Sequence, residues 1–492
     1  MRFIDGPNIP PDKLAEAING LRRGKPATAM FPVIQKQSRY GFLFEDFQDH
    51  PAMLLDPDPQ TANHLVRLGE TMVDPDPFDS AADSNIPSAY TYFGQFIDHD
   101  VTRQSLVNQP TFQDPITPMS LDEIGSASNS RTFGLDLDCL YGPAIEPNAA
   151  YEIPRNADNQ HQLLTELTAG QPYVAELPRE ADPPHFALIG DRRNDENLMV
   201  SQLHLAFMLA HNRLVTEGAN FEQARRILRQ HYQWLVINDY LNWVADNGVV
   251  TAVLNGGLNL FDPPDDDVFV PLEFAVGAFR FGHCMIRDSY NYNSTFDGPF
   301  LFQLLLPGFL VSYHHIPGEW IIDWNRFLDG TNKARRIRTT LAQGLSVMED
   351  GQGGVLPFGL ATLDLLKGFL MRLPTGEAIA NHLGQEISST ALLSVMTNEQ
   401  RTILTEGGFE NRTPLWFYTL AEAQAVGNGR LGPVGSAIVA SVLIGLARKS
   451  KDSYLRYPNW RPTLGNNGQF ELSDLLRFAG VLNNPKGESH GN

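Results

Sequence analysis

A short segment, FGQFIDHDVT at residues 93–102, brings a histidine together with an amide and two carboxylates. If the segment is helical, Gln95 and His99 lie four residues apart on one face, with Asp98 and Asp100 to either side of His99. A neutral imidazole in that position can accept a proton and return it during a reaction. A solvated acidic turn with a chance histidine is the alternative. The apolar neighbours favour burial, and buried carboxylates need partners.

Two later segments carry a guanidinium group and a second histidine. GDRRNDEN at residues 190–197 sets Arg193 and Glu196 three residues apart, just before an apolar helical pattern. This spacing fits a functional pair, and it equally fits the electrostatics of a helix start. AFRFGHCMIR at residues 278–287 surrounds His283 with apolar side chains. A neutral imidazole in an apolar wall suits a haem iron ligand, although a hydrogen-bonded core histidine has the same pattern.

A fourth segment, RTFGLDLDCLYG at residues 131–142, is rich in oxygen ligands. Thr132, Asp136 and Asp138 alternate with other residues, so that side-chain oxygens and backbone carbonyls could wrap around a cation. Calcium prefers such hard oxygen ligands. The strip therefore predicts either a calcium site or a plain Asp-rich turn.

Helices are expected to position these segments, because apolar residues recur at the spacing of amphipathic helices. Sustained period-two alternation is nearly missing. We therefore predict a mainly α fold with long irregular loops and little β structure. Residues 1–85, rich in Pro and Asp, predict an extended arm that packs on a domain formed by residues 86–492. The predicted helices are 90–102, 197–218, 221–247, 272–286, 333–341, 360–370, 376–383, 398–406, 414–425 and 434–449.

Composition limits the classes of function. The 492 residues are 42% hydrophobic with a net charge of −20, which excludes a disordered chain and disfavours binding to nucleic acid or anionic lipid. Two cysteines cannot supply a multi-cysteine metal site, so His and carboxylates must hold any metal. The longest apolar stretch, 434–447, is short for a bilayer span, and the N-terminus lacks a signal-peptide pattern. We expect a soluble protein, cytoplasmic or secreted by a non-classical route.

Taken together, the four segments resemble the signature segments of animal-type haem peroxidases, the peroxidase–cyclooxygenase superfamily. Residues 360–380 resemble the helix and turn that follow the proximal ligand in this family, and WIIDWNRF at 320–327 resembles a stretch of its bacterial members. The resemblance covers residues 85–450. It implies a haem-peroxidase helical fold, haem b and calcium as cofactors, and hydrogen peroxide with small electron donors as substrates.

The resemblance also implies roles for individual residues. His99 is the distal histidine with Gln95 as its pocket neighbour, and Arg193 is the distal arginine. His283 is the proximal iron ligand. Asp98 and Glu196 match the carboxylates that form ester links to haem in mammalian members. The remaining matches are Arg280 and Asp364 on the cofactor-binding side and Asp100, Thr132, Gly134, Asp136 and Asp138 as calcium ligands, with Gly134 contributing a carbonyl.

Three positions depart from the family pattern. Asp364 stands where the vertebrate enzymes have Asn beside the proximal histidine, which predicts more imidazolate character and a lower iron potential. Lys367 replaces the usual Arg, which affects the contacts on the propionate side. Asn197 stands where myeloperoxidase has the Met of its sulfonium bond, so that bond cannot form here. We therefore expect bromide, iodide, thiocyanate or phenols as donors rather than chloride.

Two other functions remain open. A fatty-acid dioxygenase of the same superfamily would need a Tyr three residues before the proximal histidine, where this chain has Arg280. A non-catalytic adhesion or matrix protein could retain the fold without the chemistry. The set of His99, Arg193 and His283 argues against that second alternative.

Overall fold

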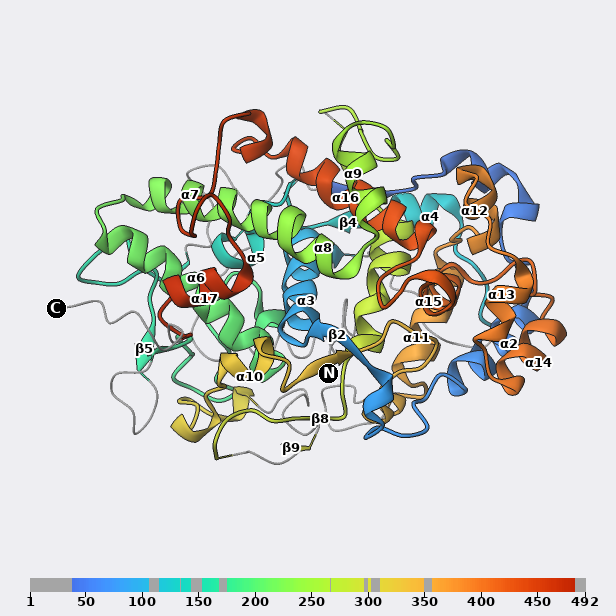
Figure 1. Cartoon of the computed structure of the whole chain (residues 1–492), viewed down its shortest axis with the longest axis horizontal. Helices are drawn as coiled ribbons and strands as arrows, with labels where there is room; N and C mark the ends of the chain where they lie inside the picture. Colours follow the sequence, from blue (N-terminus) through green and yellow to red (C-terminus); the bar gives the residue numbers. More distant parts are fainter. Residues whose placement is uncertain are drawn as a thin grey trace.

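The computed structural model describes residues 38–105, 115–132, 134–142, 153–167, 175–265, 267–295, 300–301, 310–348 and 356–482. Helices dominate this part of the chain and strands are short, which confirms the predicted mainly α fold. Figure 1 shows α3 (Ala89–Val101) near the middle of the molecule. In that view α6 (Leu198–Thr216) and α7 (Phe221–Trp234) lie to one side of α3, and α11 (Leu360–Leu370) and α15 (Leu415–Val426) lie to the other.

Most predicted helices form close to their expected bounds, because local signals mark their ends. The side chain of Asn197 caps α6 by accepting from the amide of Val200. Helix α16 (Pro433–Lys449) is buried along most of its length, as its apolar sequence predicts. The other helices are α2 (Pro59–Glu70), α4 (Leu121–Gly125), α5 (Asp138–Tyr141), α8 (Leu241–Val244), α9 (Asn247–Leu254), α10 (Trp324–Leu328), α12 (Gly376–Leu383), α13 (Ser389–Ser394), α14 (Asn398–Glu406) and α17 (Leu472–Phe478).

A small sheet ties the chemically interesting segments together. Its strand order is β3 (Gln104–Ser105), β4 (Ser128–Asn129), β1 (Ser38–Gly41) and β7 (Phe269–Pro271). Strand β1 pairs antiparallel with β4 and parallel with β7. Strand β3 follows α3, β4 precedes the Asp-rich strip, and β7 precedes the segment that carries His283. The sheet therefore anchors three segments that lie far apart in the sequence.

Three predicted helices take other forms. Residues 333–341 do not form a helix: β10 (Lys333–Arg335) pairs antiparallel with β2 (Asp83–Pro87), and buried Arg335 binds Asp74 and Asp83. These distant partners override the local helical spacing. Residues 272–286 are helical but not α: a π turn, η6 (Glu273–Gly277), leads into a 3-10 helix, η7 (Ala278–Met285). The predicted helix 221–247 likewise passes through a π turn, η5 (Leu235–Tyr240).

The N-terminal arm is not extended throughout its described part. Helix α2 lies within it and packs against α11, burying Leu65 and Leu68 completely. The two helices approach so closely that a Cβ on Gly69 would lie 2.3 Å from Oγ1 of Thr362. Residues 1–37 of the arm lie outside the described residues. The boundary between residues 85 and 86 stays a prediction.

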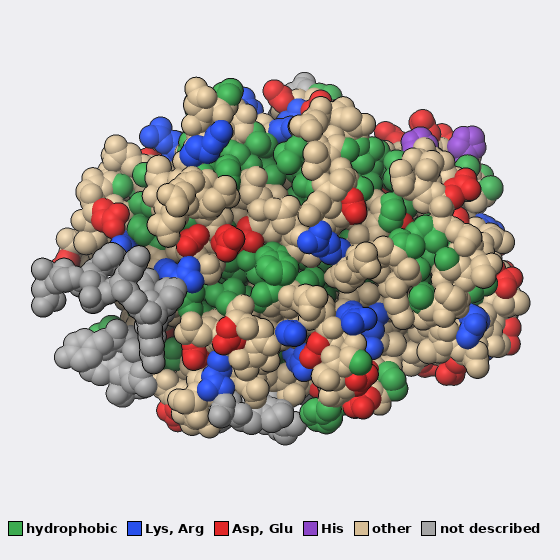
Figure 2. All heavy atoms as spheres, in the orientation of Figure 1, with side chains coloured by type: hydrophobic (Ala, Val, Ile, Leu, Met, Phe, Trp, Pro, Cys, Tyr) green, Lys and Arg blue, Asp and Glu red, His purple; other side chains and the backbone are tan. Residues whose placement is uncertain are grey.

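The surface and the cysteines agree with the composition. On the face seen in Figure 2, basic side chains are interspersed with acidic ones and do not gather into one patch. Cys139 and Cys284 are both buried and form no disulfide. Within the described ranges, none of the helices combines the length and the apolar character needed to cross a bilayer.

Candidate active site

His99 lies fully buried on α3 and is held by a hydrogen-bond relay. Its Nδ1 donates to Oδ1 of Asn194 at 2.8 Å, and the amide nitrogen of Asn194 lies 2.9 Å from Nδ1 of His204. The lone pair of the ring therefore lies on Nε2. This Nε2 atom of His99 is buried and has no hydrogen-bond partner among the described residues. Burial, reinforced by the nearby Arg193 guanidinium, lowers the pKa of His99 to about 3. The imidazole is therefore neutral at physiological pH and can accept a proton.

Arg193 is fixed next to His99 by a buried carboxylate. Its guanidinium contacts both oxygens of Asp191 and donates to the carbonyls of His99 and Thr102. Arg131 shares Asp191 and also donates to the carbonyl of His99 at 2.9 Å. Burial opposes ionisation of Asp191, but the two guanidinium groups hold its pKa well below the ordinary value. A fixed positive charge thus lies beside the buried histidine.

The other predicted distal residues come together on α3 and the adjoining 3-10 turn η4 (Arg192–Asp195). Asn197 donates to Oε1 of Gln95 at 3.0 Å while capping α6. Asp98 is buried and accepts from the Thr102 hydroxyl at 3.2 Å. Glu196 ends η4 and is half-buried. Asn197, at the position where the sulfonium bond was excluded, therefore joins Gln95 to the start of α6.

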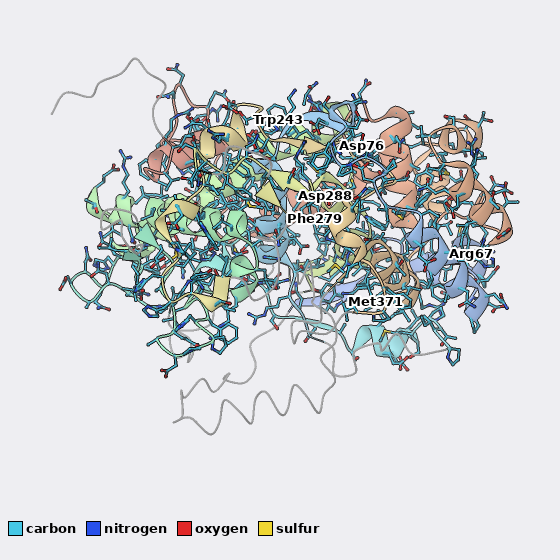
Figure 3. All side chains as sticks on the ribbon, turned by 90° about the horizontal axis from the view of Figure 1, so that it is seen from below. Arg67, Asp76, Trp243, Phe279, Asp288 and Met371 are labelled. Atoms are coloured by element: carbon cyan, nitrogen blue, oxygen red, sulfur yellow. The ribbon has the colours of Figure 1, made fainter. Side chains whose placement is uncertain are left out.

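His283 lies on η7, which packs against α3. Its Nδ1 donates to Oδ2 of Asp364 at 2.5 Å, and Arg280 donates to the other oxygen of the same carboxylate. Asp364 is completely buried on α11. Burial raises the pKa of Asp364, but His283 and Arg280 outweigh it and bring the pKa below its ordinary value. Figure 3 shows Phe279, from the same 3-10 helix, near the middle of the molecule.

These side chains fit a haem. A ligand to iron needs a neutral ring whose second nitrogen is held by an acceptor, and Asp364 is such an acceptor for His283. A Cβ added at Gly282 would meet no atom of the described residues within 4 Å, so there is open space beside His283. On the α3 side, the unpartnered Nε2 of His99 and Nε2 of Gln95 are buried polar atoms that a bound ligand could satisfy.

The predicted calcium ligands also come from two neighbouring elements, α3 and the strip that ends in α5. Asp100 accepts from the amides of Leu137 and Cys139, both at 3.2 Å. Asp138 accepts from the amide of Thr132, and Asp136 accepts from the hydroxyl of Thr132.

Burial raises the pKa of Asp100 to about 6 and that of Asp138 to about 7, with neighbouring carboxylates adding to both. A Cβ on Gly134 would lie 2.9 Å from Oδ2 of Asp136, so the backbone there passes close to this carboxylate. Asp100, Asp136 and Asp138 do not offer three oxygens that all lie within 4.8 Å of one another. The donor chemistry therefore fits calcium, but the two elements would have to draw together around an ion.

Sequence reasoning missed the residues that orient the histidine and the arginine. Asp191 and Asn194 both lie within GDRRNDEN, yet Asp and Asn are common at helix starts, so their types alone carry no signal. Arg131 is the first residue of the predicted calcium strip, where only the oxygen-bearing side chains carry a signal. Their roles depend on α3, whose His99 lies 32 residues before Arg131 and 95 residues before Asn194.

One family model and several known proteins are similar to this chain. Residues 126–301 match the family described as Animal haem peroxidase. A peroxidase-like protein of Margaritifera margaritifera is 26% identical over 345 residues, covering 56% of this chain and 43% of the relative. The chain thus spans less than half the length of this curated relative.

Solved structures show the shared fold. Peroxidase A from Dictyostelium discoideum superposes with a TM-score of 0.61 at 16% identity, covering 88% of this chain and 90% of that chain. A fatty acid alpha-dioxygenase from Oryza sativa superposes with a TM-score of 0.54 at 14% identity, covering 85% and 74%. Residues 126–301 are thus similar to the Animal haem peroxidase family, and the chain shares its helical fold with these solved structures.

Proposed function

We propose that the protein is a haem-dependent peroxidase that uses hydrogen peroxide to oxidise small donors. The observation that carries the proposal is the neutral, buried His99, whose Nε2 lacks a partner among the described residues and whose Nδ1 is held by Asn194. Arg193 lies beside it, and His283 lies on the segment packed against the same helix.

The residues of α3 and η4 transfer the peroxide proton and stabilise the charge that develops as the peroxide bond breaks. Nε2 of His99 takes a proton from one peroxide oxygen and returns it to the other as the bond between them breaks. Asn194 keeps the accepting nitrogen unprotonated by binding the proton-bearing Nδ1. Arg193, held in place by Asp191, stabilises the negative charge that develops on the departing oxygen. A neutral histidine and a fixed cation suffice for both roles.

The residues of η7 and α11 would hold the cofactor. When bound, haem supplies the electrons that reduce the peroxide and then oxidises the donor. His283 would bind its iron, and Asp364 accepts the hydrogen bond that makes this imidazole more basic. Arg280 neutralises the second oxygen of Asp364 and so keeps the carboxylate ionised in a buried place.

An absorption spectrum and a donor assay test the proposal together. Protein produced with haem available should show a Soret band that changes on adding hydrogen peroxide, and it should oxidise iodide, bromide, thiocyanate or phenols. His283→Ala should lose the band, whereas His161→Ala, at an exposed histidine, should keep it. A protein that shows no Soret band under these conditions would refute the proposal and favour an adhesion or matrix role.

A fatty-acid dioxygenase is the competing enzyme, favoured by the likeness to the Oryza sativa structure. Arg280 occupies the position where the oxygenase would need its tyrosine, and it is buried against Asp364. Oxygen uptake with linoleate in the absence of peroxide would support that alternative. We expect none above the haem-free control.

We also propose one calcium ion between Asp100 and the strip of Thr132, Gly134, Asp136 and Asp138. Hard oxygen ligands and buried, mutually repelling carboxylates support it. Elemental analysis should find one calcium per chain, and strong chelation should lower thermal stability and activity. Protein that contains no calcium and is indifferent to chelation would rule the site out.

A further inference from the structure

A second cluster of metal-binding side chains lies away from His99 and His283. Glu166, His314 and His315 each offer one ligand atom, and these atoms all lie within 4.8 Å of one another. Glu166 belongs to β5 (Glu166–Leu167), which lies on the left side of Figure 1 below α6. The two histidines follow the short 3-10 helix Leu310–Ser312. Two segments about 150 residues apart in sequence thus meet at this cluster.

The hairpin beneath the cluster places two carboxylates face to face. Strand β5 pairs antiparallel with β6 (Ala175–Glu176), and Glu166 is directly opposite Glu176. Like charges at directly opposed positions destabilise a strand pair. Glu176 is only 3% exposed, and its carboxylate accepts from the amide of Ile316 at 2.9 Å. The position therefore favours a positive charge between the hairpin and the residues after 310.

His315 contacts a carboxylate through Nδ1, as metal-bound histidines commonly do, so Nε2 is the nitrogen left for an ion. Its Nδ1 donates to the buried carboxylate of Glu176 and lies 3.8 Å from Oε2 of Glu166. A carboxylate on one ring nitrogen fixes the ring and makes the other nitrogen a better ligand. The His314 ring stands nearly perpendicular to that of His315, with centroids 4.2 Å apart, and makes an edge contact with His185.

We propose that Glu166, His314 and His315 bind a divalent transition-metal ion of the zinc class, with Glu176 positioning His315. Two imidazoles and one carboxylate are a typical zinc ligand set, and calcium does not favour nitrogen ligands. Tetrahedral bonds of about 2.1 Å place ligand atoms about 3.4 Å apart, so the cluster would contract by about 1.4 Å at most. Glu166 and His315 retain 27% and 39% side-chain exposure, so an ion can enter from solvent and keep a water as fourth ligand.

The ion would stabilise the region behind the active site rather than take part in its chemistry. Three residues after Glu176, buried Arg179 makes a two-pronged ion pair with Asp195 at 2.6 and 2.7 Å. Asp195 belongs to η4, together with Arg193. Fastening the hairpin to residues 314–316 would therefore support the turn that carries the distal arginine. This inference does not depend on the proposed peroxidase activity.

Zinc titration of the purified protein tests the site. Chelator-treated protein is returned to buffer with excess Ca²⁺, so that oxygen-only sites do not take up zinc, and ZnCl₂ is added in a calorimeter. One ion per chain should bind at this site, with a rise in the thermal unfolding temperature. His314→Ala should weaken zinc binding about 100-fold or more, and Glu176→Gln about 10-fold to 100-fold.

His161→Ala serves as the matched control, because His161 is an exposed histidine of the same part of the chain, before β5. It should bind zinc like the wild type. The ion pair with Glu176 belongs to His315, so His314→Ala leaves that ion pair in place, and a loss of zinc affinity in this variant reports on His314 as a ligand. Circular dichroism of each variant checks folding. Failure of the wild type to bind zinc, or equal affinity of wild type and folded His314→Ala, would overturn the site.

Discussion

Replacing Asp364 by Asn should raise the reduction potential of haem bound to His283. Asn keeps the size of the side chain and an acceptor oxygen for Nδ1, so the change removes mainly one negative charge. That charge is present in the folded protein, because His283 and Arg280 lower the pKa of Asp364 in spite of its complete burial. The charge makes the imidazole a stronger donor and favours ferric over ferrous iron.

The size of the effect follows from the 2.5 Å contact between Nδ1 of His283 and Oδ2 of Asp364. Hydrogen bonds to charged groups contribute about 1.5 to 3 kcal/mol, and neutral ones about 0.5 to 1.5 kcal/mol. Losing the charge therefore removes about 1 to 1.5 kcal/mol of preference for the oxidised iron. For a one-electron couple, about 59 mV corresponds to a tenfold change in equilibrium, which gives a rise of about 40 to 60 mV.

Spectroelectrochemical titration at pH 8 measures this potential directly. Glu422→Gln is the matched control, because Glu422 is also a buried carboxylate and accepts from the amides of Val434 and Gly435 at the start of α16. It should leave the potential unchanged. The frequency of the iron–histidine stretch should also fall in Asp364→Asn. A potential within about 10 mV of wild type, or a lower one, in a folded haem-loaded variant would refute this reasoning.

Three further outcomes are expected. His99→Ala should retain haem but react with hydrogen peroxide about 100-fold more slowly or worse in stopped-flow measurements, and a rate within a few-fold of wild type would reject its role. Burial raises the pKa of Glu422 to about 7, so the folded protein binds the proton of this acid more tightly than the unfolded chain does. The free energy of unfolding should therefore fall by about 3 kcal/mol as the pH rises from 4.5 to 7. Urea unfolding measures this loss, which should be largely absent in Glu422→Gln. After peroxide treatment, denaturing mass spectrometry should find haem attached to wild type but less to Asp98→Ala and Glu196→Ala, whereas complete release from wild type by acidic solvent would exclude ester links.

Local sequence determined the helices whose formation depends on their own residues. The 3.6-residue apolar spacing and a capping Asn197 placed α6 within two residues of its bounds, and the same spacing gave α11, α12 and α14. Motif spacing also singled out His99, Arg193 and His283, because each is flanked by residues of distinctive type. These features are encoded within about one or two helical turns.

Tertiary structure decided the features whose partners lie far away in the sequence. Residues 333–341 have helical spacing, yet β10 pairs with β2, about 250 residues earlier, and Arg335 binds Asp74. Asn194 orients His99 only because η4 packs on α3, and Asp364 reaches His283 only because α11 packs against η6, which leads directly into η7. A hydrogen bond or an ion pair depends on distance in space, and sequence spacing predicts that distance only within one element.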